Sequence, residues 1–149
     1  MSTHTTIPLG EIEIRFLVEA DDSQGAATVF ECEIRPAAKV PAPHSHDGFE
    51  ETVYGLAGVT TFTVDGATTE LAVGDALCIR RGQVHQFVNE GSTKSCFLSV
   101  ATPGVFGPDY FLEIRDVLMA AAGGPPDLAA LMDVMQRHGL TPVAPAPTA

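Results

Sequence analysis

Residues 43–58 read PHSHDGFEETVYGLAG and contain the most informative pattern in the chain. His44 and His46 are two residues apart, so on a strand both side chains face the same side and can reach one ion together. Glu51 follows His46 by an odd number of residues, which would point it to the opposite face of an unbroken strand. Asp47-Gly48 can supply a bend that resets the alternation. We therefore expect Glu51 to be a third ligand if the chain bends there.

A second stretch, residues 74–89, reads GDALCIRRGQVHQFVN. His85 follows a turn at Gly82 and begins a strand that carries Phe87 on the same face. Together with His44, His46 and a carboxylate, the His85 imidazole would complete a set of three nitrogens and one oxygen. Such a set suits Fe, Mn, Co, Ni, Cu or Zn. It also leaves one or two positions for water or substrate, which is typical of catalytic rather than structural metal centres.

Short segments of alternating polarity run from Glu11 to Ala101 and predict a β-sandwich or β-barrel. Two predicted strands lie at residues 12–18 and 30–34, and others at 52–56, 59–64, 68–73, 76–80, 85–88 and 95–101. Asp65-Gly66 is a strong signal for a tight turn between two of them. The pattern therefore predicts an all-β domain over residues 11–103, preceded by an N-terminal lead at residues 1–10.

The pattern changes after Pro103. Pro108-Asp109 can start a helix with Phe111, Ile114, Leu118 and Ala121 on one face, and Gly123-Gly124 ends it. A second helix opens at Pro125-Pro126-Asp127, with an apolar stripe of Leu128, Leu131, Met132 and Met135, and closes at Gly139. We expect both stripes to pack against the barrel, within a helical segment at residues 104–140. Residues 141–149 are rich in Pro and Ala and are predicted to be a tail.

The two histidine-containing stretches resemble the two motifs of the cupin superfamily. The first motif is His-x-His, three or four residues, Glu, six residues, Gly, which His44, His46, Glu51 and Gly58 match. The second motif runs from a glycine through Pro-x-Gly to His and Asn, and here Gly74, Gly82, His85 and Asn89 occupy those positions. Two positions depart from the motifs, because Ala38 replaces a glycine and Arg80 a proline. In the family these two positions shape turns and do not bind the metal.

The resemblance implies a small antiparallel β-barrel or jelly roll that holds one divalent transition metal through His44, His46, Glu51 and His85. Glu50 competes for the carboxylate role, and the six-residue step to Gly58 selects Glu51. Among single-domain cupins, the motif spacing is most similar to the quercetin dioxygenase-like type. That similarity predicts a dioxygenase acting on a small organic substrate that chelates the metal. Glu51 would then be the catalytic residue, taking a proton from a substrate hydroxyl when it loosens from the metal.

Two other functions stay open at this level: a non-oxidative cupin such as an isomerase or decarboxylase, and a non-catalytic module that binds or senses a small molecule. Tyr54, Arg80 and Gln86 are near the ligands in sequence and can contact a substrate, although each is more often structural. The phenylalanines at 62, 87 and 97 are expected to line the barrel. His4, in the lead, and His138, at a helix end, are not expected to be ligands.

The composition narrows the partners. The chain has 19 acidic and 8 basic residues, a formal charge of −11, which disfavours nucleic acid and anionic membranes as partners. Three scattered cysteines do not form a disulfide framework. The N-terminus lacks the features of a signal peptide and no apolar run is long enough to span a bilayer, so we expect a cytoplasmic protein. Because cupins commonly dimerise through terminal strands, we expect a homodimer, with residues 12–18 suited to edge pairing.

Overall fold

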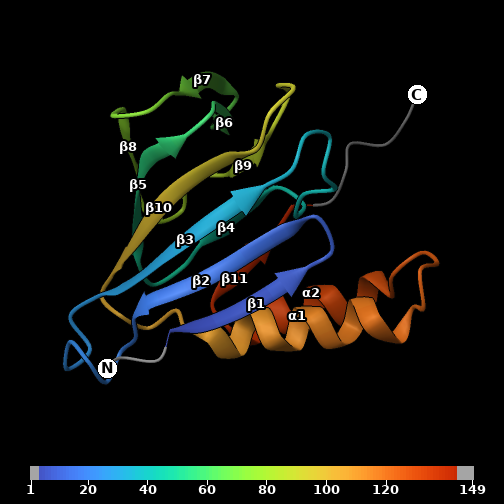
Figure 1. Ribbon diagram of the computed structural model, residues 1–149. Helices are drawn as coiled ribbons and strands as arrows, with labels where there is room; N and C mark the ends of the chain where they lie inside the picture. The colour runs from blue at the N-terminus through green and yellow to red at the C-terminus, as the bar shows by residue number, and fades with distance from the viewer. Residues whose placement is uncertain (1–3, 144–149) are drawn as a thin grey trace.

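The computed structural model describes residues 4–143, which form two antiparallel β-sheets and two helices (Figure 1). The strands are β1 (Thr5–Leu9), β2 (Ile12–Val18), β3 (Thr28–Ile34), β4 (His44–His46), β5 (Glu50–Ala57), β6 (Thr60–Val64), β7 (Ala67–Leu71), β8 (Ala76–Ile79), β9 (His85–Val88), β10 (Ser95–Thr102) and β11 (Leu140–Pro142). The helices are α1 (Pro108–Ala120) and α2 (Leu128–Arg137). The predicted fold class, an antiparallel β-fold with a C-terminal helical part, is confirmed.

The two sheets face each other and divide the strands unequally. One sheet has the order β1-β2-β3-β10-β5-β8 and the other has the order β11-β4-β9-β6-β7. Strands β4 and β5 follow each other in the chain but belong to different sheets. The crossing between them is the bend at Asp47 and Gly48, so the predicted break in the alternation is confirmed.

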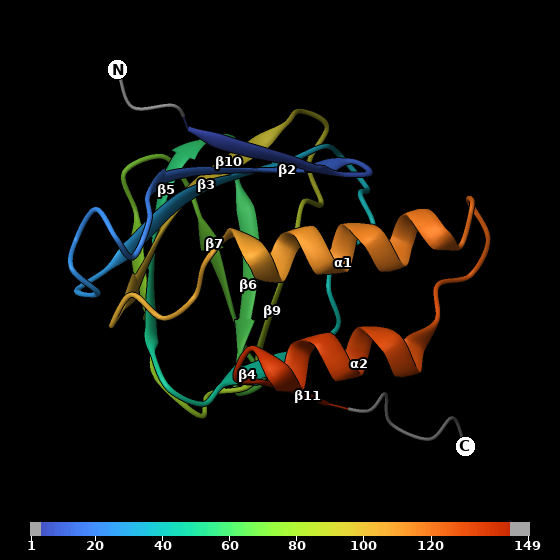
Figure 2. The same cartoon turned by 90° about the horizontal axis from the view of Figure 1, so that it is seen from below.

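The helices close the side of the sandwich where the sheets end in β1 and β11. Helix α1 packs beside β1 and α2 beside β11, and the two helices contact each other (Figure 2). The Phe111 ring of α1 lies 5.9 Å from that of Phe16 and 5.4 Å from that of Phe30, measured between centroids. The C-terminal helical segment therefore belongs to the same hydrophobic core as the sheets.

Every strand predicted between Thr52 and Ala101 is present, with its ends shifted by at most two residues. The ends of the chain differ from the prediction. Part of the expected lead forms β1, which pairs with β2 and is itself the edge strand. Residues 12–18 therefore lie inside the sheet and not at its edge. Part of the expected tail forms β11, because its backbone completes the sheet beside β4. The rest of the predicted tail, residues 144–149, lies outside the described residues.

The helix boundaries agree with the prediction, and the buried faces agree in part. Asp127 caps α2 by accepting a hydrogen bond from the Ala130 backbone N–H at 3.1 Å. In α2, Met135 is buried as expected, whereas Leu128 and Met132 are exposed and Val134 is buried instead. The face that α2 buries is set by its contacts with β11 and α1, which the helical period does not reveal. Neither helix in residues 4–143 has the length and apolar character needed to cross a membrane.

Candidate metal centre

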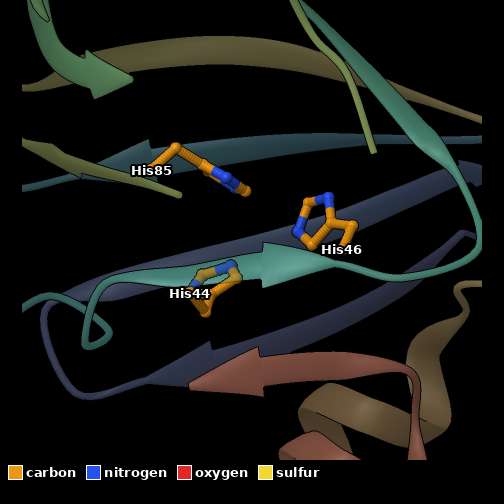
Figure 3. A group of neighbouring side chains, drawn as sticks. All are labelled: His44, His46 and His85. Atoms are coloured by element: carbon orange, nitrogen blue, oxygen red, sulfur yellow. The ribbon is translucent and has the colours of Figure 1, made fainter. Parts of the chain in front are cut away.

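Strands β4 and β9 bring three histidines together in the five-stranded sheet. His44 of β4 is paired directly with His85 of β9, and His46 lies on the same side of β4 as His44. Ligand nitrogens of the three side chains lie within 4.8 Å of one another, and all three residues are buried. Figure 3 shows the three rings converging on the same space. The fold therefore assembles the histidine cluster that the sequence predicted.

Hydrogen bonds to the backbone orient two of the imidazoles. His44 Nδ1 lies 2.8 Å from the Ala42 carbonyl oxygen, and His85 Nδ1 lies 3.0 Å from the Gln83 carbonyl oxygen. A carbonyl oxygen can only accept, so each Nδ1 carries the proton and donates it in the neutral ring. The Nε2 atoms of His44 and His85 are then left with free lone pairs, which is how metal-binding histidines are usually held.

His46 is the third member of the cluster and has a different environment. Its ring stacks on Phe49 at 4.3 Å and lies 6.0 Å from the Phe106 ring, between centroids. Its Nδ1 atom is buried and has no hydrogen-bond partner among the described residues. An unpartnered buried nitrogen is costly unless something else binds the ring. This feature and the two free Nε2 atoms fit a metal ion well.

Burial keeps the three histidines neutral. Desolvation, reinforced by the neighbouring His85, lowers the pKa of His44 to about 4. Burial also lowers the pKa of His46 strongly and the pKa of His85, with the other two histidines adding to the effect at His46. Neutral imidazoles are the form that binds metal, so the cluster is ready to bind at neutral pH without losing protons first.

Glu51 approaches the cluster from the opposite sheet. It pairs with Ala101 of β10 and Ile79 of β8, and its side chain is buried and lines the same cavity as the three histidines. Burial raises the pKa of Glu51 to about 7, and the neighbouring Ser99 hydroxyl acts in the opposite direction. The carboxylate is not part of the compact histidine group. Its role as a fourth ligand therefore stays a prediction.

Glu50, the competing carboxylate, is directed elsewhere. Its side chain is half-exposed and accepts a hydrogen bond from Arg81 Nε in an ion pair. The alternation restarted by the bend thus directs Glu51 to the cavity and Glu50 away from it. The motif spacing favoured Glu51 over Glu50, and the burial of Glu51 and the surface ion pair of Glu50 agree with that preference.

The turn that precedes His85 explains one departure from the family motif. Gly82 has a φ of +77°, and its N–H donates to the His46 carbonyl oxygen at 3.0 Å. Arg80, which replaces the expected proline, uses its backbone N–H to donate to Gln83 Oε1 at 2.9 Å. A proline has no N–H to donate, so this chain holds the same turn by another bond.

The histidines and Glu51 lie on the wall of a cavity of about 60 Å³. Aliphatic and aromatic side chains dominate that wall, and Phe87 and Phe97 are among them, as predicted. Phe62 packs behind these two rings, at 5.8 and 5.1 Å between centroids. The remaining lining residues are Leu9, Ile12, Ile14, Phe30, Cys32, Pro41, Phe106, Tyr110, Phe111 and Leu140.

The lining differs from the sequence-based list of substrate contacts. Tyr54, Arg80 and Gln86 are exposed and do not line the cavity. Tyr110 of α1 does line it. The sequence analysis did not select this residue, because the spacing of apolar residues in a helix does not show which of them reach the cavity between the sheets. His4 is exposed and His138 lies 3.1 Å from Glu113, so neither belongs to the cluster, as predicted.

Comparison with known proteins agrees with this arrangement. The sequence profile of the family described as Cupin domain matches residues 30–101. A predicted oxalate decarboxylase from Thermotoga maritima is 25% identical, with 68% of this chain and 92% of that chain covered and a TM-score of 0.60. The polyketide cyclase RemF from Streptomyces resistomycificus is also 25% identical, with 75% and 89% covered and a TM-score of 0.58. KdgF from Halomonas sp. shares the fold at 18% identity, with 67% and 86% covered and a TM-score of 0.59. No curated protein matches the sequence.

The fold, the two histidine motifs and the family match show that the chain belongs to the cupin superfamily. Its three buried histidines can hold a metal ion. The matched region contains all three histidines and Glu51. The closing wall of the cavity, formed by residues such as Phe106, Tyr110 and Leu140, lies outside it.

Proposed function

We propose that this protein is a metal-dependent cupin enzyme that acts on a small organic substrate in an oxidative reaction of the dioxygenase type. The observation that carries the proposal is the convergence of three buried, neutral imidazoles on one largely apolar cavity. His44, His46 and His85 would hold the metal, with Glu51 as the fourth ligand. A divalent transition metal at this position supplies a Lewis acid that orients substrate oxygens and, if it is redox-active, chemistry with O2.

The protein's own side chains prepare the cavity for such a substrate. The phenylalanine rings and aliphatic groups keep bulk water away from the bound molecule, which strengthens electrostatic interactions inside the site. Glu51 has a pKa of about 7, so at neutral pH its carboxyl group can both accept and release a proton. In our proposal it accepts a proton from the bound substrate.

A non-oxidative reaction is the second candidate. Two solved structures that are 25% identical to this chain are described as a predicted oxalate decarboxylase and a polyketide cyclase. Decarboxylation and isomerisation need a positioned acid or base and an oriented substrate, and Glu51 and the cavity would serve these as well. The third candidate, a non-catalytic module that binds or senses a small molecule, has the same cavity and no turnover.

Two measurements separate these candidates. Protein purified without added metal should contain close to one equivalent of a transition metal by elemental analysis, and a metal-free preparation that takes up none would contradict the proposal. O2 consumption should then be followed with enediols, flavonols, thiols and small oxo acids. Consumption with one class supports the dioxygenase. Product formation without O2 consumption supports the second candidate, and binding without any product supports the third.

The ligands are tested with variants. The double variant His46→Ala with Glu51→Ala should bind less than a tenth of the metal that the wild type binds. His138→Ala is the matched control, because this histidine pairs with Glu113 outside the cluster, and it should leave the metal content unchanged.

A further inference from the structure

The cavity contains two polar side chains beyond the three histidines and Glu51. Cys32 is fully buried, and its raised pKa keeps the thiol protonated, so it is a weak donor. Tyr110 is the other. It is the third residue of α1, outside both histidine motifs and outside the family match, and only 5% of it is exposed. Its phenol hydroxyl is therefore the strongest neutral donor on the cavity wall.

Aromatic neighbours fix the Tyr110 ring. Its centroid lies 4.9 Å from that of Phe106, 5.0 Å from that of Phe111 and 5.6 Å from that of His138. Phe106 in turn stacks on Phe49 at 5.0 Å, and Phe49 stacks on His46. The ring thus belongs to a continuous packed cluster that reaches a candidate metal ligand. A donor held in this way loses little conformational entropy when a ligand binds.

The hydroxyl of Tyr110 stays protonated. Burial raises its pKa far above the ordinary value, and the nearby Glu51 carboxylate raises it further. Tyr110 and Glu51 line the same cavity. A protonated phenol can donate a hydrogen bond, so a ligand in the cavity that presents an acceptor oxygen can receive one from Tyr110.

The volume of the cavity limits the ligand. About 60 Å³ is available, and one water needs roughly 10–15 Å³ on the same scale, so there is room for roughly four to six water-sized groups. That is enough for a molecule with a carbon chain of a few atoms and its oxygens. A flavonol is much larger than this cavity.

We infer that Tyr110 is a substrate-binding residue that donates a hydrogen bond to an oxygen of the substrate, and that the substrate is a small oxo acid or dicarboxylic acid of two to four carbons. Two adjacent oxygens of such a compound would face the histidine cluster, and a further carboxylate oxygen would accept from Tyr110. This inference rests on the proposed function, because the ligand needs the metal.

The chain has two tyrosines and no tryptophan, which makes Tyr110 directly observable. In a Tyr54→Phe background Tyr110 is the single tyrosine, and Tyr54 is on the surface at 44% exposure. We expect oxalate or pyruvate, added to the Zn²⁺-loaded protein, to change the near-ultraviolet absorption and fluorescence of Tyr110. Zinc is used because it does not react with O2, so the readout is independent of turnover.

The decisive comparison is between Tyr110→Phe and Tyr54→Phe, which each remove one hydroxyl. Tyr110→Phe should weaken oxalate and pyruvate binding roughly tenfold, the size of one hydrogen bond to a charged oxygen, and leave zinc uptake unchanged. Tyr54→Phe should bind both as the wild type does. Binding of 2-oxoglutarate, which has a longer chain, should be at least tenfold weaker than that of pyruvate.

Each outcome decides something. Normal zinc uptake with equal oxalate affinity in Tyr110→Phe and Tyr54→Phe would overturn the inference alone. Binding of 2-oxoglutarate as tight as that of pyruvate would overturn the assignment of the substrate class. A wild-type protein that takes up no zinc would overturn the proposed function, and the inference with it.

Discussion

Glu50 and Glu51 are adjacent in the sequence and have opposite environments. Glu50 pairs with Arg81 at the surface, whereas Glu51 is buried in the cavity wall with a pKa raised to about 7 from an ordinary 4.5. When folding raises the pKa of a carboxyl group, the group favours the folded state most at low pH, where it is protonated in both the folded and the unfolded chain. That contribution is lost as the pH rises from about 4.5 through 7, because the unfolded chain ionises first.

Replacing Glu51 with Gln should remove this pH dependence. In metal-free protein, Glu51→Gln should gain stability relative to the wild type between about pH 5 and pH 8, by an amount of the order of 3 kcal/mol at the upper end. Urea unfolding at several pH values checks this. Glu50→Gln is the matched control and should change the free energy of unfolding by less than about 1 kcal/mol, because it removes only a surface ion pair. A constant difference between wild type and Glu51→Gln across the range would contradict the prediction.

Gly58, the last residue of the first motif, is needed for its backbone conformation. Its φ is +58°, and a Cβ at this position would lie 2.4 Å from the Lys94 carbonyl oxygen. Gly58→Ala should therefore destabilise the protein by about 1–3 kcal/mol or more, because the backbone strain and the clash with the Lys94 carbonyl oxygen both contribute. Gly48→Ala is the control, because a Cβ there meets nothing within 4 Å. Thermal unfolding of both variants checks the difference, and equal melting temperatures would contradict it.

Strand β4 carries two of the three candidate metal ligands and is only three residues long. It has one register pair with β9, between His44 and His85, and a longer pairing with β11. In that second ladder Leu140 is opposite His46 and Pro142 is opposite His44. Two further hydrogen bonds flank the ladder: Asp47 N–H to the Gly139 carbonyl at 2.8 Å, and the Thr141 hydroxyl to Asp47 Oδ1 at 2.9 Å. The position of both histidines therefore depends on the C-terminal strand.

Truncating the chain after His138 should lower metal affinity at least tenfold although every candidate ligand remains. Without β11, strand β4 keeps one register pair and its histidines are no longer held in place. Metal titration of the purified protein measures the effect, and far-ultraviolet circular dichroism shows whether the sheets persist. A truncation after Val143 keeps all of β11 and is the control. If the shorter protein is folded and binds metal with unchanged affinity, β11 has no role in the site.

At the scale of the whole molecule, the site lies between the two sheets. The histidines come from the five-stranded sheet and Glu51 from the six-stranded sheet, and the helices cover the side where both sheets end. If Glu51 is a ligand, a bound ion links the two sheets, and removing it should weaken the entire fold. The expected homodimer stays a prediction, and light scattering of the purified protein checks it.

Metal removal should lower the stability of the molecule in a pH-dependent way. At a free metal concentration a hundred times the Kd, binding stabilises the folded state by about 2.7 kcal/mol. A chelator should therefore lower the melting temperature of the wild type and leave that of His46→Ala unchanged. The stabilisation should persist at mildly acid pH and disappear as the pH falls through about 4, where protons begin to compete for the His44 imidazole, whose pKa is lowered to about 4. An equal effect of the chelator at neutral pH and at a pH below about 4 would contradict this account.

The sequence by itself determined the all-β class, the strands between Thr52 and Ala101, and the histidines that converge. These features depend on short-range rules: side-chain alternation along strands, glycine turns and motif spacing. The bend at Asp47-Gly48 was also readable, because an odd spacing between two inward residues requires one. Local chemistry fixes the strands, the turns and the bend, whereas the approach of His85 to His44 and His46 was inferred from the resemblance to the cupin motifs.

Only the tertiary structure decided what completes the cavity. The roles of β1, β11 and Tyr110 depend on which strand edges are left open and on how far the helices reach, and no local pattern contains that information. Leu140 belongs to the cavity wall because β11 pairs with the strand of His44 and His46, nearly a hundred residues earlier in the chain. The physical reason is that pairing between distant segments is selected by the burial of the whole core. A pattern of residues in one segment specifies only which face that segment will bury.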